Sequence, residues 1–63
     1  MKLVGNLTGK AYQINKSFLN LQRGDTIYCF AEECDIVWVE LPILFCGVNQ
    51  VQLAKSIFFN LIS

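Results

Sequence analysis

The chain has no histidine, a single proline and few charged residues. Charged residues make up 16% of its 63 residues, whereas hydrophobic residues make up 54%. A disordered chain would show the opposite balance, because it lacks the apolar surface needed to offset the entropy of ordering. Five Lys/Arg and five Asp/Glu give a formal net charge of zero, so broad attraction to nucleic acid or anionic membrane is not expected. We predict one small domain spanning residues 1–63.

The missing histidine also argues against catalysis, because it removes the usual activating partner of a serine or cysteine nucleophile. The glycines are scattered and form no phosphate-binding loop. Cys29, Cys34 and Cys46 lack a CxxC unit and a fourth ligand, so no zinc site is expected. Glu33 and Asp35 flank Cys34, and their negative charge disfavours a reactive thiolate there. We predict a protein that is not an enzyme and has no metal and no cofactor.

No apolar run approaches the roughly 18–20 residues that a bilayer span needs. The most apolar segment, residues 36–48, is interrupted by Glu40 and Pro42, and the segment after Lys2 is too short and polar for a signal-peptide core. An odd number of cysteines beside apolar segments is typical of buried thiols in a reducing compartment, with one disulfide plus a free thiol as the open alternative. We therefore expect a cytoplasmic protein without a membrane partner.

Gly, Pro and Asn divide the chain into short segments whose apolar residues alternate with period two, which is typical of strands. The predicted strands cover residues 10–14, 26–31, 36–41, 43–46 and 56–62. A hairpin tip is expected at residues 32–35, a turn or sheet edge at Pro42 and one helical turn at residues 50–54. A single helix over residues 50–62 stays open, because Val51, Ala54, Phe58 and Ile62 follow a helical period. Five to six short antiparallel strands predict an all-β fold that closes into a compact barrel.

Residues 18–27, Phe-Leu-Asn-Leu-Gln-Arg-Gly-Asp-Thr-Ile, resemble the loop-to-second-strand junction of SH3-like barrels. Trp38 follows an acidic loop, and Gly47-Val48-Asn49 before Leu53 is similar to the segment that precedes the last strand of that family. The resemblance covers roughly residues 9–62 and implies a small SH3-like barrel with a short helical turn before the last strand. Lys16 replaces the loop acids and Asn49 the groove proline of peptide-binding members, so proline-rich ligands are not expected.

A second resemblance competes with the first. Gly9-Lys10, the segment Ile14-Asn15-Lys16, residues 21–25 and Ile36-Val37 resemble the swapped-hairpin DNA-binding family of transcriptional regulators and antitoxins. The resemblance implies a dimer with Lys10, Lys16 and Arg23 on one face. That family has proline in place of Asn15 and a basic DNA face, whereas this chain is neutral. DNA binding is therefore the alternative function.

The excess of apolar residues is the feature that indicates function most directly. A barrel of this size has one thin core and cannot bury both faces of its strands, and exposed aromatic patches commonly mark interfaces. Leu3, Val4 and Leu7 could instead cover the second face. Ala31 is expected on the same strand face as Ile27 and Cys29. The expected interior is Ile27, Cys29, Val37, Val39, Leu41, Leu44, Cys46, Ile57, Phe59 and Leu61. The residues expected on the other face are Tyr28, Phe30, Ile36, Trp38 and Phe58.

The sequence thus predicts a non-catalytic interaction protein that binds a larger protein. It would be a stand-alone adaptor, an accessory subunit or a small inhibitor. The expectation of an inhibitor of the kind that phages and mobile elements encode rests on the chain being a minimal domain that starts at its own Met1. Acidic residues at the hairpin tip would guide a partner's approach. Self-association is also expected, because small domains short of core often form oligomers. The predicted protein-binding residues are Tyr28, Phe30, Trp38, Phe58, Glu32, Glu33 and Asp35.

Overall fold

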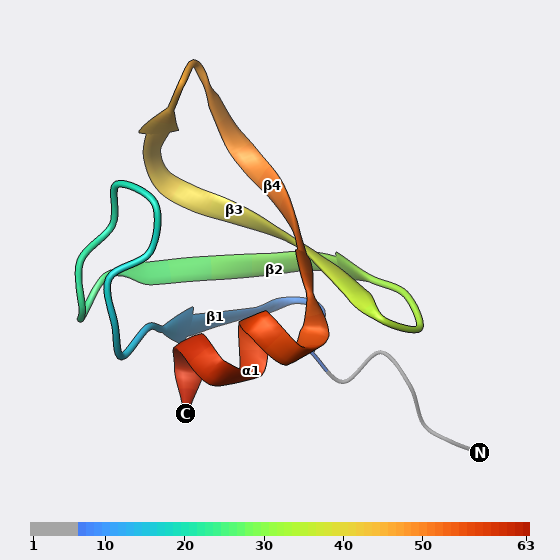
Figure 1. Cartoon of the computed structure of the whole chain (residues 1–63). Helices are drawn as coiled ribbons and strands as arrows, with labels where there is room; N and C mark the ends of the chain where they lie inside the picture. The colour runs from blue at the N-terminus through green and yellow to red at the C-terminus, as the bar shows by residue number, and fades with distance from the viewer. Residues whose placement is uncertain (1–6) are drawn as a thin grey trace.

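The computed structural model describes residues 7–63. Four antiparallel strands follow one another in a single sheet of order β1-β2-β3-β4, and a short helix ends the chain (Figure 1). Within residues 7–63 the sheet stays open, so the expected closed barrel of five to six strands is not found there. The elements are β1 (Lys10–Gln13), β2 (Thr26–Glu32), β3 (Ile36–Phe45), β4 (Val48–Ala54) and α1 (Lys55–Ile62).

The third strand is longer than expected, because Pro42 does not end it. β3 continues to Phe45, and its register with β4 shifts between Glu40 and Phe45. Such an irregularity tolerates a proline, which cannot donate a ladder hydrogen bond. The chain reverses at Cys46 and Gly47, which both have positive φ, 53° and 85°. Two positive φ angles match the twist of a tight hairpin, and this hairpin projects away from the rest of the molecule (Figure 1).

The C-terminal region reverses the predicted order of helix and strand. Residues 50–54, expected as a helical turn, belong to β4, and residues 56–62, expected as a strand, belong to α1. Phe58 and Leu61 are buried, whereas Ile57 and Phe59 are exposed. This spacing of three residues follows the helical period and not the strand period. The alternative of one helix over residues 50–62 was correct only for its second part.

The core lies on one face of the sheet, which we call the covered face. Residues of α1 and of the segment between β1 and β2 pack against it. The expected interior is confirmed for most of β2 and β3 but is wrong for Leu44, Cys46, Ile57 and Phe59, which are exposed. The buried residues are Ile14, Leu21, Ile27, Cys29, Val37, Val39, Leu41, Leu53, Phe58 and Leu61.

A bulge in β2 changes which side chains share a face. Cys29 pairs with Val39 and Ala31 pairs with Trp38, so Phe30 is an extra residue on β2. Beyond the bulge, Glu32 pairs with Val37 and lies on the covered face. Ala31 was expected on the same face as Cys29, but the bulge moves it to the opposite face with Trp38.

Candidate protein-binding face

The opposite side of the sheet, which we call the outer face, carries two rows of paired residues. Directly opposed residues of antiparallel strands share a face, so the register defines each row. The first row runs from Ala11 on β1 through Tyr28 and Glu40 to Gln50 on β4. The second row contains Ala31, Trp38 and Gln52. Both central strands therefore place one large aromatic residue on this face.

Tyr28, Phe30 and Trp38 are the predicted aromatic site residues that lie on the two central strands. Tyr28 is 43% exposed, and Trp38 is half-buried between its neighbours Ala31 and Gln52. Phe30 is half-buried at the bulge between Cys29 and Ala31. A shallow open depression of about 400 Å³ borders Tyr28 and is also lined by Glu40 and Pro42. The aromatic part of the predicted site thus consists of three residues and not four.

Phe58 was placed in the site wrongly, because its segment is a helix and not a strand. Its side chain is fully buried in the core. Its ring meets Tyr12 of β1 edge to face, with a centroid separation of 5.0 Å and an interplanar angle of 83°. This is a preferred geometry for an aromatic pair, in which the positive ring edge faces the negative ring face. Phe58 therefore holds α1 against the sheet.

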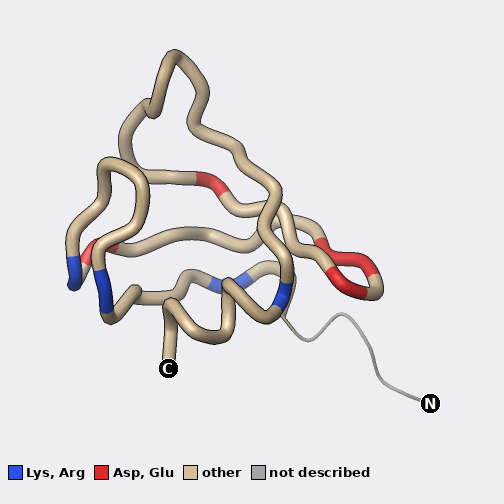
Figure 2. Tube along the Cα trace, in the orientation of Figure 1, with Lys and Arg blue, Asp and Glu red and all other residues tan. Residues whose placement is uncertain are grey.

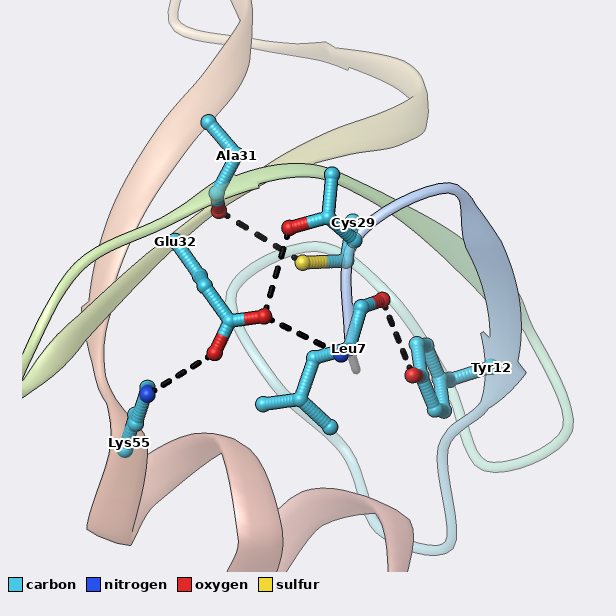
Figure 3. Close-up of polar contacts among 7 residues, drawn as sticks. Leu7, Tyr12, Cys29, Ala31, Glu32 and Lys55 are labelled. Atoms are coloured by element: carbon cyan, nitrogen blue, oxygen red, sulfur yellow. Dashed lines mark hydrogen bonds and ion pairs between the residues drawn. The ribbon is translucent and has the colours of Figure 1, made fainter. Parts of the chain in front are cut away.

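Glu32 was also assigned to the site wrongly, because the bulge directs it to the covered face. Its side chain is only 9% exposed and its Oε2 lies 2.8 Å from Nζ of Lys55. Its Oε1 accepts hydrogen bonds from the Leu7 amide at 3.0 Å and the Thr8 hydroxyl at 3.3 Å (Figure 3). The Lys55 ammonium is the main cause that lowers the pKa of Glu32, with smaller help from Leu7 and Thr8.

Glu33 and Asp35 remain as predicted, exposed at the tip of the β2–β3 hairpin. The Glu33 amide donates to the Ile36 carbonyl at 2.9 Å and closes the turn. Figure 2 shows the acidic residues of this hairpin together at one end of the molecule. An open depression of about 520 Å³ is lined by Glu33, Cys34, Asp35 and Ile36. The tip therefore presents solvated carboxylates at the margin of the outer face.

The three thiols differ in their surroundings, and none is paired in a disulfide. Cys29 is buried as expected, whereas Cys34 and Cys46 are exposed at the two hairpin tips. Burial is the main cause that raises the pKa of the Cys29 thiol. Residues 7–63 contain no group of three or more His, Cys, Asp or Glu side chains placed to hold a metal ion.

The basic residues named for DNA binding lie on separate elements. Lys10 is exposed on β1, and Arg23 is exposed in the segment before β2. Lys16 donates a hydrogen bond of 2.9 Å to Asn60 Oδ1 of α1. Figure 2 colours the Lys and Arg residues blue, and they are spread over several parts of the chain. DNA binding stays a prediction.

Sequence reasoning missed a second set of exposed apolar residues at the β3–β4 hairpin. Ile43 and Val48 are each 51% exposed and Leu44 is 63% exposed. The dipeptide Cys46-Gly47 at the turn was a signal for a longer hairpin, since glycine readily takes positive φ. We call Ile43, Leu44 and Val48 the hairpin tip below.

The covering segment expected from Leu3, Val4 and Leu7 is only partly described. Leu7 packs against the core on the covered face and not over the outer aromatic residues. Leu3 and Val4 lie outside the described residues. Within residues 7–63, the single helix is too short to cross a bilayer.

No protein-family model, no curated protein and no solved structure matches this chain. The SH3-like and swapped-hairpin resemblances therefore gain no support from known proteins. The aromatic face, which no strand or helix within residues 7–63 covers, is the feature from which a function can be argued.

Proposed function

We propose that this chain is a non-catalytic protein–protein interaction module that binds a larger protein through the outer face of its sheet. It would act as a stand-alone adaptor, an accessory subunit or a small inhibitor. The single observation that carries the proposal is the position of Tyr28 and Trp38 on the face opposite the helix and the core. Contiguous exposed apolar patches on small proteins commonly mark interfaces.

The chemistry of the outer face supports a protein partner. Tyr and Trp combine large apolar area with a hydrogen-bonding group, and they are enriched among the residues that dominate interface energies. Gln50 and Gln52 border them with neutral amides, so Glu40 is the charged residue in the two rows. Glu33 and Asp35 would lie at the margin, where charge guides approach more than it adds affinity. A basic rim on the partner would complement them.

The test begins with recovery of bound protein from a lysate of the source organism, using a tagged chain and nuclease treatment. Affinity for the purified partner is then measured by titration. We expect Trp38→Ala to weaken binding by about 2 kcal/mol or more, as for central interface aromatics, while the variant stays folded. Tyr28→Ala should weaken it in the same direction.

Phe59→Ala is the matched control. Phe59 is 47% exposed, close to the exposure of Tyr28, but it lies on α1 away from the outer face. Unchanged affinity in Phe59→Ala together with a loss in Trp38→Ala would support the site. Equal loss of folding and binding in Trp38→Ala would place Trp38 in the core and refute the assignment. Loss of all bound material after nuclease treatment would favour the DNA-binding alternative.

A further inference from the structure

The edge of the sheet at β4 has neither the charge nor the proline that protects many edge strands from pairing. β4 is the last strand in the sheet order, so one side of its backbone faces no other strand of residues 7–63. Its seven residues, Val-Asn-Gln-Val-Gln-Leu-Ala, include no charge and no proline. Natural edge strands are usually short, charged, bulged or interrupted by proline. The other edge, β1, is only four residues long and contains Lys10.

We propose that β4 pairs antiparallel with β4 of a second copy of this chain. Directly opposed residues of two paired strands share a face of the sheet. The outer face therefore continues from one copy into the other only in registers that oppose outer-face residues to outer-face residues. With the two-fold axis at Val51, all seven residues find a partner, and Val48 opposes Ala54 of the second copy. Gln50 opposes Gln52 on the outer face, where two amides can exchange hydrogen bonds. The two four-stranded sheets then form one continuous sheet.

The exposed apolar residues at the two ends of β4 give an independent reason for the same arrangement. The hairpin tip lies at the start of β4, and Ile57 in the first turn of α1 lies just beyond its end. Ile57 is 47% exposed. Antiparallel self-pairing brings the start of one β4 beside the end of the other. Each hairpin tip would therefore meet the first turn of α1 in the second copy. Because the dimer has two-fold symmetry, this contact between the hairpin tip and Ile57 would form twice and bury exposed apolar residues at both ends of the paired strands.

Charge does not oppose this association. The net charge of the chain is zero, and the nearest cation along the chain, Lys55, is already paired with Glu32. Edge pairing also leaves the outer face uncovered, so the dimer does not depend on the proposed binding function. Failure of either proposal would leave the other standing.

The opposed glutamines allow a charge-pair test of the register. Gln50→Lys with Gln52→Lys places like charges opposite each other at two symmetric positions, which is destabilising in a sheet. Gln50→Lys with Gln52→Glu places opposite charges there instead. Both glutamines are exposed, so the chain of each variant should keep its fold. Ala11→Lys, on the outer face at the β1 edge, is the matched control.

Light scattering after size exclusion should give wild type a mass twice that of the 7.2 kDa chain at high micromolar concentration. We expect dimerisation to weaken about tenfold in the lysine–lysine variant, on the scale of two like-charge cross-strand pairs. The lysine–glutamate and Ala11→Lys variants should stay dimeric. A wild type that is monomeric throughout would overturn the proposal, as would a lysine–lysine variant that dimerises as well as wild type. Recovery of a heterologous strand on β4 in place of a second copy would also overturn it.

Discussion

Glu32 and Lys55 form an ion pair of 2.8 Å that joins the last residue of β2 to the first residue of α1. A lysine at this point is unfavourable for a helix, because the N-terminus already carries partial positive charge. α1 has no acidic residue in its first turn and no side-chain cap from Ala54. Glu32 supplies the missing negative charge from another element. Its second oxygen holds Leu7 and Thr8, so one carboxylate ties three segments together.

This arrangement predicts a loss of stability in acid. The pKa of Glu32 is lowered from its ordinary 4.5, chiefly by Lys55. The unfolded chain therefore binds the proton more tightly than the folded chain does. The stabilisation is fully present above 4.5 and is lost as the pH falls through the lowered folded pKa. Glu32→Gln should reduce the free energy of unfolding at neutral pH and flatten its acid dependence.

Urea unfolding at a series of pH values, followed by the fluorescence of Trp38, measures this effect. Glu33→Gln is the matched control, since Glu33 is exposed in the turn between β2 and β3. This variant should leave both the free energy of unfolding and its pH dependence close to wild type. An acid dependence that is the same in Glu32→Gln and wild type would contradict the role of the ion pair.

The two adjacent aromatic residues of α1 should differ sharply in their contribution to stability. Phe58 is fully buried and packs on Tyr12, so Phe58→Ala should lower the free energy of unfolding by about 3–5 kcal/mol. Phe59 is exposed and keeps only a tilted contact with Phe58, so Phe59→Ala should cost at most about 1 kcal/mol. Thermal unfolding followed by circular dichroism compares them. Equal costs would mean that residues 56–62 do not form this helix.

The thiols offer a direct test of the packing. Cys34 and Cys46 are exposed, whereas Cys29 is buried and burial raises the pKa of its thiol. Since the thiolate is the reactive form, a disulfide reagent should label two thiols rapidly in the folded protein. The third should react only after denaturant is added. Cys29→Ala should leave the number of rapidly labelled thiols unchanged, and three rapid thiols in wild type would contradict the buried position.

The period-two pattern of residues 26–41 was sufficient to predict β2, most of β3 and much of the core. Ile27, Cys29, Val37 and Val39 alternate there with Tyr28 and Trp38, and each lies on its predicted side. Two aromatic members of the candidate site follow from the same alternation. The acidic tip was also predictable, because the chain must turn between the two strands.

The remaining differences have local causes that a periodic pattern does not contain. The bulge at Phe30 places Ala31 and Glu32 on the faces opposite to those that strict alternation along β2 gives. Nothing about these two residue types indicates that the strand contains an extra residue. The segment Ile57-Phe58-Phe59 has high strand propensity, but the burial of Phe58 against Tyr12 is a tertiary contact that decides for a helix. The pairing of β3 and β4 beyond Pro42 depended on turn geometry at residues 46 and 47.

That turn gives the last prediction. Gly47 has φ of 85°, and an added Cβ would meet no atom within 4 Å. Gly47→Ala should therefore cost about 1 kcal/mol through backbone conformation alone. Cys46 occupies the same left-handed region at φ 53°, which asparagine tolerates better than cysteine, and Asn-Gly is a preferred pair in such turns. Cys46→Asn should raise the free energy of unfolding by about 0.5 kcal/mol.

Cys46→Ala separates the backbone effect from loss of the thiol, because alanine has no preference for positive φ and should leave stability near wild type. All variants are compared by urea unfolding at one protein concentration, since the stability of a self-associating chain depends on concentration. If Gly47→Ala matches wild type while Cys46→Asn gives no gain, residues 46 and 47 do not form a left-handed turn. β4 would then pair with β3 in another register. The proposed dimer register, with its two-fold axis at Val51, would then be wrong.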